Sequence, residues 1–158
     1  MKNRPFITSF FIALSVLLSA CVPKEQYNNV SENNQASSSL TETYWKLVQL
    51  NGVLAQMVVG QEREQYFVLE SQNKQVRGVA GCNSFFGQFE TTQSKNSDSL
   101  QFKTLGATKM ACPDAEIDEQ AYLTVFGDTA HYKIVGETLT LLDHDRVELA
   151  TFNSVYLH

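Results

Sequence analysis

The sequence has few of the residues that most often carry catalysis or hold metal ions. Its 158 residues include three cysteines and three histidines. The cysteines form no C-x-x-C pair, and neither a G-x-S-x-G nucleophile elbow nor a D-x-D-x-D-G calcium loop occurs. These absences disfavour a serine hydrolase, a zinc site and a calcium site.

Positive charge is also scarce, because 12 lysine and arginine residues face 17 acidic residues. If the first twenty residues are removed, Lys2 and Arg4 go with them and no acid is lost, which leaves a side-chain balance of −7. Nucleic-acid phosphates require a basic patch. We therefore expect no nucleic-acid partner.

The N-terminus has the pattern of a secretory signal over residues 1–20. Two basic residues precede the apolar run 6–18, which is shorter than the roughly 20 apolar residues that a membrane crossing needs. The following sequence LSAC resembles the lipobox of bacterial lipoproteins, in which the signal is cut before the cysteine. This resemblance implies that Cys21 carries a diacylglycerol and an acylated amino group such as a palmitate amide, an anchor of several acyl chains. The alternative is ordinary secretion with a coincidental cysteine.

Residues 21–43 are rich in Asn, Ser, Gln and Glu and have no periodicity that could bury a face. They predict a flexible tether that holds the domain close to a membrane. Val22 follows Cys21, so the aspartate that often retains lipoproteins in the inner membrane is absent. We expect a lipid-anchored protein of the cell envelope, at the outer membrane and facing the periplasm.

Residues 44–158 fit one domain with a single core. Short segments rich in β-branched and aromatic residues alternate with turn signals, at 44–50, 54–60, 64–71, 75–81, 85–91, 99–105, 130–136, 137–143 and 146–152. This spacing predicts a mainly β (α+β) fold, a compact antiparallel sheet that curls into a sandwich or open barrel of about eight strands.

One segment, 113–128, has the pattern of an amphipathic helix instead. Pro113 and Asp114 supply a first turn with an N-cap, acids follow where the helix dipole favours them, and Gly127 is placed for a C-terminal cap. Apolar residues recur every four positions from Ile117. We expect this helix to cover an edge or face of the sheet.

The glycine-rich stretch GVAGCNSFFGQF predicts a tight, bulged hairpin. Gly78, Gly81 and Gly87 tolerate positive φ, and Asn83 is the next most tolerant type. The segment ATKMACP is the expected neighbour of this corner. Strand alternation predicts that Phe85, Phe86 and Phe89 divide between core and surface.

These pieces together resemble the META domain family, to which HslJ-type bacterial lipoproteins belong. The resemblance is carried by YWKLVQLNG, VRGVAGCNSFFGQFE, LGATKMACP, EQAYL and YKIVGETLTLLD, in order and spacing over about 110 residues. It implies a compact antiparallel β fold with one helix, similar to that of secretin pilot lipoproteins, which bind acyl chains or a partner's C-terminal segment. It also implies links to heat shock, stress and antibiotic tolerance, but no catalytic residues. The matching motif positions are Gly78, Gly81, Cys82, Asn83, Gly87, Met110, Cys112, Pro113 and Glu119.

Cys82 and Cys112 are the cysteines that remain once Cys21 is lipidated, and both fall on motif positions of the family. An even pair in an oxidising envelope favours a disulfide. The bond would close a loop of 31 residues, for which chain entropy gives roughly 3.5 kcal/mol. Two buried thiols, or a reactive or metal-binding pair, are the alternatives.

The residues that a reactive or metal-binding cysteine would need beside it are poorly placed in the sequence. A cysteine nucleophile requires a nearby base, but His131 precedes a strand, His144 lies in a turn and His158 is terminal. Met110 and Cys112 could bind Cu(I), although their alternation is more typical of strand packing. We therefore expect no enzyme, no metal and no cofactor.

The resulting prediction is a monomeric envelope lipoprotein that binds a protein partner or an apolar ligand, in envelope maintenance or stress tolerance. A pilot-like chaperone of an outer-membrane partner would have an apolar groove between helix and sheet. An enzyme-inhibitor module would expose a loop such as LGATKMACP. An enzyme would need a cleft with perturbed titratable groups.

Overall fold

The computed structural model describes residues 37–61, 63–93, 98–111 and 118–156. Its strands are β1 (Tyr44–Leu50), β2 (Val53–Leu54), β3 (Tyr66–Glu70), β4 (Gln75–Val79), β5 (Ser84–Gln93), β6 (Asp98–Ala107), β7 (His131–Val135), β8 (Thr138–Leu142) and β9 (Glu148–Val155), and its helix is α1 (Glu119–Asp128). All pairings between these strands are antiparallel. The predicted mainly β fold with one helix is confirmed.

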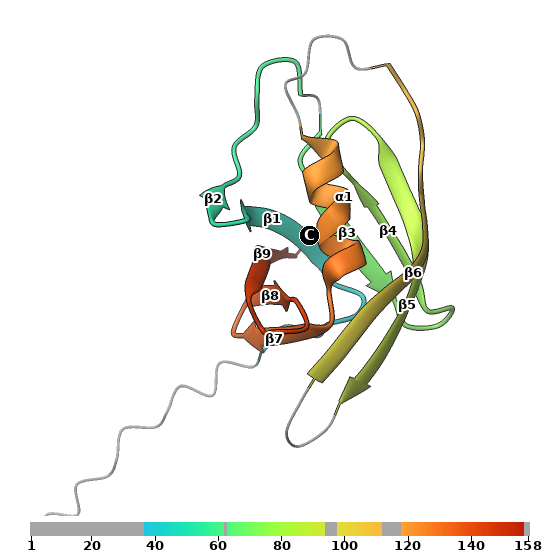
Figure 1. Cartoon of the computed structure of the whole chain (residues 1–158), viewed down its shortest axis with the longest axis vertical. Helices are drawn as coiled ribbons and strands as arrows, with labels where there is room; N and C mark the ends of the chain where they lie inside the picture. The colour runs from blue at the N-terminus through green and yellow to red at the C-terminus, as the bar shows by residue number, and fades with distance from the viewer. Residues whose placement is uncertain (1–36, 62, 94–97, 112–117, 157–158) are drawn as a thin grey trace, which may run out of the picture. The chain divides into compact units, whose positions relative to one another are not determined.

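The sheet closes on itself because β1 pairs with β9 as well as with β3. The closing register runs from Tyr44 opposite Val155 to Leu50 opposite Ala150, with one irregularity. Strands β1 and β3 to β9 thus form a closed eight-stranded barrel, and the two-residue β2 is added beside the end of β1 (Figure 1). Closure protects the strand edges that an open sheet would expose.

The barrel interior holds the apolar core, because alternate residues of each strand point inward. Its largest fully buried side chains are Trp45, Tyr122, Phe67, Phe85, Phe89, Phe126, Phe152, Leu69, Leu100, Leu139, Leu141 and Val76. Of the three phenylalanines in the glycine-rich stretch, Phe85 and Phe89 are buried whereas Phe86 is 61% exposed. The predicted division of that stretch between core and surface is confirmed.

Helix α1 packs against the barrel where the wall is least continuous. The only residue pair between β6 and β7 in the described part of the chain is Ser99 with His131. Phe126 of α1 is fully buried and contacts Phe67 and Phe102 edge-on, with ring centroids 5.2 and 4.9 Å away. The helix therefore covers the half of β6 that β7 leaves unpaired. Within the described ranges, no helix combines the length and apolar character that a membrane crossing requires.

The ends of α1 differ from the prediction. Asp118 is the N-cap, and its carboxylate accepts a hydrogen bond from the backbone N–H of Ala121 at 2.8 Å. The predicted cap Asp114 lies outside the described residues. The prediction that Gly127 caps the C-terminus is wrong, because Thr129 does so and its hydroxyl donates to the Val125 carbonyl at 2.6 Å.

The predicted strand 54–60 is also wrong. Only Val53 and Leu54 pair with β1, and the following residues are irregular, with Val59 91% exposed. On this edge of β1 the N–H of Ala55 still donates to the Val48 carbonyl at 2.8 Å, and β3 then pairs with Trp45 and Lys46, so the edge offers the segment no further partner. Ala55 packs against the core, whereas Met57 and Val59 remain exposed.

Residues 38–43, which belong to the predicted tether, make hydrogen bonds to the barrel. The backbone N–H of Ser38 donates to the Gly136 carbonyl at 2.9 Å. The buried indole of Trp45 donates to the Leu40 carbonyl at 3.0 Å. Ser38 thus lies at the turn between β7 and β8, whereas the backbone N–H of Glu42 donates to the carbonyl of Leu69 in β3 at 2.8 Å.

Candidate functional site

The motif residues meet at the turn between β4 and β5. Gly81 has φ +123°, a conformation that favours glycine. The turn is closed by a hydrogen bond from the Ala80 N–H to the Asn83 carbonyl at 2.8 Å. The predicted tight corner around Cys82 is confirmed.

Glu119, the first residue of α1, binds this turn directly. Its Oε1 accepts hydrogen bonds from the backbone N–H groups of Cys82 and Asn83, at 2.7 and 2.6 Å. Its Oε2 accepts from the Asn83 side-chain amide at 2.6 Å. The carboxylate therefore joins the start of the helix to the hairpin turn with three hydrogen bonds.

Asn83 extends the network to the chain that follows β6. Its Oδ1 accepts from the Thr108 hydroxyl at 2.9 Å and from the Met110 N–H at 2.7 Å. The Thr108 hydroxyl in turn accepts from the Ser84 N–H at 3.1 Å. The expected approach of ATKMACP to the glycine-rich corner is confirmed for Thr108 to Met110, and Cys112 and Pro113 lie outside the described residues.

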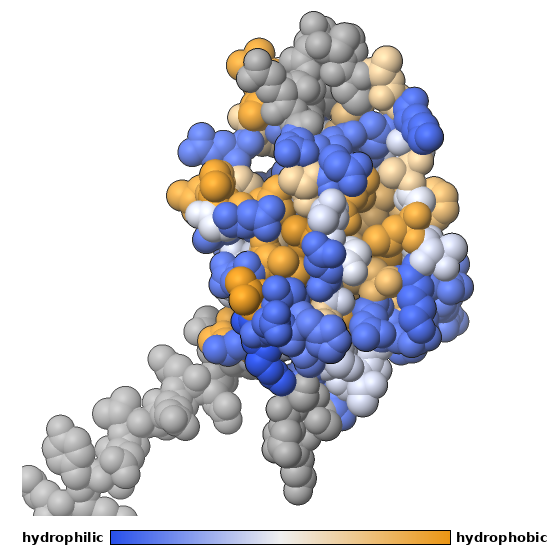
Figure 2. Space-filling model, in the orientation of Figure 1, coloured by the Kyte–Doolittle hydropathy of each residue, from blue (hydrophilic) through white to orange (hydrophobic). Residues whose placement is uncertain are grey.

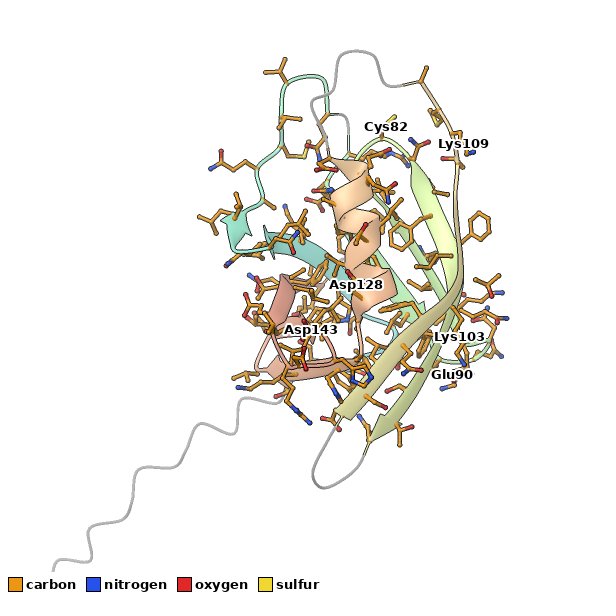
Figure 3. All side chains as sticks on the ribbon, in the orientation of Figure 1. Cys82, Glu90, Lys103, Lys109, Asp128 and Asp143 are labelled. Carbon is orange, nitrogen blue, oxygen red and sulfur yellow. The ribbon has the colours of Figure 1, made fainter. Side chains whose placement is uncertain are left out.

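A third segment, the connection from β2 to β3, reaches the same turn from the other side. The Arg63 guanidinium donates to the Cys82 carbonyl and to the Ser84 hydroxyl. Gln65 donates to the Ala80 carbonyl at 2.9 Å. Three separate parts of the chain thus converge on one turn, which Figure 3 marks by Cys82, with Lys109 on the neighbouring segment (Figure 3).

These contacts determine the ionisation of Glu119. Burial raises the pKa of Glu119, whereas the hydrogen bonds from Asn83 and Cys82 and the nearby Arg63 guanidinium lower it. The net effect is a pKa below the usual value of a glutamate. Glu119 is therefore ionised at neutral pH and committed to a structural role.

Two of the motif glycines are required by close packing. A Cβ on Gly78 would lie 2.3 Å from the Tyr66 carbonyl oxygen, and a Cβ on Gly87 would lie 2.9 Å from the Lys103 carbonyl oxygen. Gly87 also lies at an irregularity in the pairing of β5 and β6. Both glycines let neighbouring strands approach at the bulged hairpin.

A cleft lies beside this network, between α1 and the end of β6. Its volume is about 460 Å³. Its lining residues are Asn83, Ala107, Thr108, Lys109, Asp118, Glu119, Gln120 and Leu123. Figure 2 shows apolar surface in the region between α1 and β6 (Figure 2).

The chemical character of this cleft is mixed. The Asp118 carboxylate accepts a hydrogen bond from a backbone N–H of the helix start, and the Glu119 carboxylate accepts from backbone N–H groups of the turn between β4 and β5. Leu123 and Ala107 are partly buried and pack on the core, so they give the cleft an apolar part. Such a surface can recognise a ligand by shape and hydrogen bonding.

The histidines lie away from this site. His131 and His144 are near one another, with ring centroids 6.4 Å apart, on the segments at the ends of β7 and β8. Across the described ranges, no group of three or more His, Cys, Asp or Glu side chains is placed to hold a metal ion. His158 lies outside these ranges.

Sequence reasoning did not find Arg63, Gln65 and Thr108 as parts of the network. Each lies in an irregular segment or just after a strand, where no periodicity signals its contacts. Glu119 was included only as a motif position and as an acid at a helix start. The signal that could have revealed its partner is the Asn83 side chain beside Gly81, because such a turn presents unpaired N–H groups.

The structure is a small, closed antiparallel β-barrel covered by one helix. The Glu119 carboxylate joins the start of this helix to the glycine-rich turn at Cys82 and Asn83, and we call these contacts the carboxylate clasp. A family model described as the META domain matches residues 38–156. The chain belongs to the META domain family, as the sequence resemblance predicted.

Two solved structures share this fold. An NMR structure of a protein from Burkholderia xenovorans has a TM-score of 0.55 and 24% identity, with 75% of this chain and 85% of that chain covered. A second NMR structure has a TM-score of 0.50 and 19% identity, with 70% and 87% covered. At these identities the likeness concerns the fold alone. Among curated proteins, none matches this chain.

Proposed function

We propose that this protein is a cell-envelope lipoprotein, anchored through Cys21, whose META domain binds a partner without catalysis. The binding site is the cleft between α1 and the end of β6. Its role is in envelope maintenance or stress tolerance, as expected for an HslJ-type lipoprotein. A protein partner or an apolar ligand would bind there.

The observation that carries this proposal is the state of the acids in the cleft. Glu119 accepts three hydrogen bonds from the turn, and Asp118 caps α1. A general base needs a pKa near the working pH and a free lone pair toward the substrate, whereas the pKa of Glu119 is lowered and its oxygens are engaged. These features favour recognition over acid–base chemistry.

The remaining groups of the cleft are suited to contact a partner. Lys109 and Gln120 are exposed at its rim, and Leu123 and Ala107 are partly buried within it. Binding sites commonly combine apolar lining with a few polar groups that orient the ligand. The volume of about 460 Å³ falls within the range of small-molecule and peptide sites.

The test is photocrosslinking in intact cells, with a photoreactive amino acid in place of Leu123. The matched control carries it at Lys133, which is exposed on β7 away from the cleft. We expect one specific envelope protein or lipid to be captured from Leu123 and not from Lys133. A form with Cys21→Ser, which lacks the anchor, should lose this capture.

The identity of the captured molecule distinguishes a pilot-like chaperone from an enzyme inhibitor. An outer-membrane assembly protein would identify a pilot-like chaperone, and a hydrolase or protease would identify an inhibitor module. Equal capture from both positions, or capture from neither, would refute the cleft as the binding site. Turnover of a small substrate by the purified domain would refute the non-catalytic role.

A further inference from the structure

Both methionines of the folded domain lie on its surface. The sequence has three methionines, and one of them is the initiator. Met57 is 54% exposed and Met110 is 61% exposed. Methionine is among the residue types most often buried, and it usually fills gaps in cores. Core packing therefore does not explain why both methionines of this domain are exposed.

The two methionines belong to segments that meet at the same turn. Met57 lies in the connection between β2 and β3, whose Arg63 donates to the Cys82 carbonyl. The backbone N–H of Met110 donates to Asn83, the next residue of that turn. Figure 1 shows both segments at the same end of the barrel. Met110 also follows Lys109, which lines the cleft.

The chain segment around Met57 is uncharged, although Met57 also lines a small cavity with Lys46 and Glu64. Residues 51–61 contain no charged side chain. Val59 is 91% exposed and Leu54 is 65% exposed. Figure 2 shows this apolar surface beside β2 and along the connection that follows it. A thioether in such a place is open to reagents in the solvent.

We propose that Met57 and Met110 are oxidation sites, which peroxide or hypohalous acid in the cell envelope converts to methionine sulfoxide. A lone pair of the thioether sulfur attacks an oxygen of hydrogen peroxide, the O–O bond breaks, an S–O bond forms and water leaves. The sulfur loses two electrons and the peroxide gains them. Methionine sulfoxide reductases reverse the reaction.

The consequence of oxidation is local because neither side chain belongs to the core. The core cluster contains no methionine among the described residues. Oxidation therefore replaces two flexible apolar side chains by polar ones at one end of the barrel and leaves the barrel intact. If the cleft binds a partner as proposed above, this change lowers the affinity, and that effect alone rests on the proposed function.

The experiment treats the mature full-length protein with hydrogen peroxide and measures oxidation by peptide mass mapping. We expect one added oxygen on each of Met57 and Met110, at rates within about tenfold of that of N-acetylmethionine amide. The emission of the single, fully buried Trp45 should stay unchanged. Treatment with methionine sulfoxide reductases should remove both oxygens.

Variants supply the matched control. In Met57→Leu/Met110→Leu, peroxide should add no oxygen to these positions, and retention on a phenyl matrix should be the same before and after treatment. In the wild type, retention should fall on oxidation and recover on reduction. Oxidation about a hundredfold slower than that of the free amide, or a shift in Trp45 emission that accompanies it, would overturn the proposal. These readouts need no partner, so they stand apart from the crosslinking test.

Discussion

Replacement of Tyr122 by phenylalanine should stabilise this protein. Tyr122 is fully buried among Phe85, Phe126 and Phe152, with ring centroids 5.9, 5.2 and 6.3 Å away. Its hydroxyl has no hydrogen-bond partner among the described residues. Burial raises the pKa of Tyr122 well above its ordinary value. The hydroxyl was hydrogen-bonded to water before folding and loses that bond in the core.

The magnitude follows from two opposing terms. A buried, unpaired hydroxyl costs about 1–3 kcal/mol. Removal of one oxygen leaves a gap on the order of 10 Å³, which at about 24 cal/mol per Å³ costs about 0.2 kcal/mol. We therefore expect Tyr122→Phe to raise the free energy of unfolding by about 1 kcal/mol or more, and Tm by about 4 °C. Urea and thermal unfolding, monitored by Trp45 fluorescence, measure both quantities.

Tyr132 provides the matched control, because it is also buried but its hydroxyl accepts a hydrogen bond from Gln93 at 3.0 Å. Tyr132→Phe should lower the free energy of unfolding by about 0.5–1.5 kcal/mol. The two substitutions remove the same atom and should act with opposite signs. A loss of stability in Tyr122→Phe equal to that in Tyr132→Phe would refute the reasoning, since it would mean that the Tyr122 hydroxyl is bonded in solution.

Three further outcomes test the clasp and its surroundings. Glu119→Gln should lower the free energy of unfolding at neutral pH by about 1–3 kcal/mol, measured with urea. Because the pKa of Glu119 is lowered in the folded state, the ionised carboxylate stabilises the fold above the unfolded pKa, and this stabilisation is lost as pH falls through the folded pKa. The variant and the wild type should therefore reach the same stability in acid. Gly78→Ala, whose Cβ would lie 2.3 Å from the Tyr66 carbonyl oxygen, should cost about 1–3 kcal/mol in the same assay, and an unchanged midpoint would contradict this packing. We expect Cys82 and Cys112 to be joined, so reduction should add two hydrogens to the intact mass of the protein, and two free thiols before reduction would exclude the bond.

The sequence was sufficient to predict the fold class because most strands carry their signals locally. Alternation and turn residues mark the hairpins of β3 with β4, β4 with β5 and β7 with β8, which the structure confirms. The closing pair of β1 with β9 has no such signal, since its residues lie at opposite ends of the domain. The irregular segment after β2 was mistaken for a strand because composition does not reveal whether a partner edge is available.

The site was only partly predictable for a related reason. The tight turn at Gly81 and the approach of Met110 were predicted from residue types and from family positions. The hydrogen bonds of Glu119 with Asn83 connect residues 36 positions apart, and that of Arg63 with Cys82 depends on the course of an irregular segment. Side-chain contacts of this kind follow from tertiary packing, which one sequence does not encode in any local pattern.

The pairing of β1 with β9 also determines when this protein can finish folding. Residues near Tyr44 meet residues near Val155 only after almost the whole chain is available. Loop closure over such a separation is slow, and folds dominated by distant pairings reach the native state in milliseconds to seconds. A chain that emerges N-terminus first would therefore leave one edge of β1 unpaired until its last strand has emerged, although β3 can already pair with the other edge. During that interval the protein depends on whatever protects its unpaired strand edge.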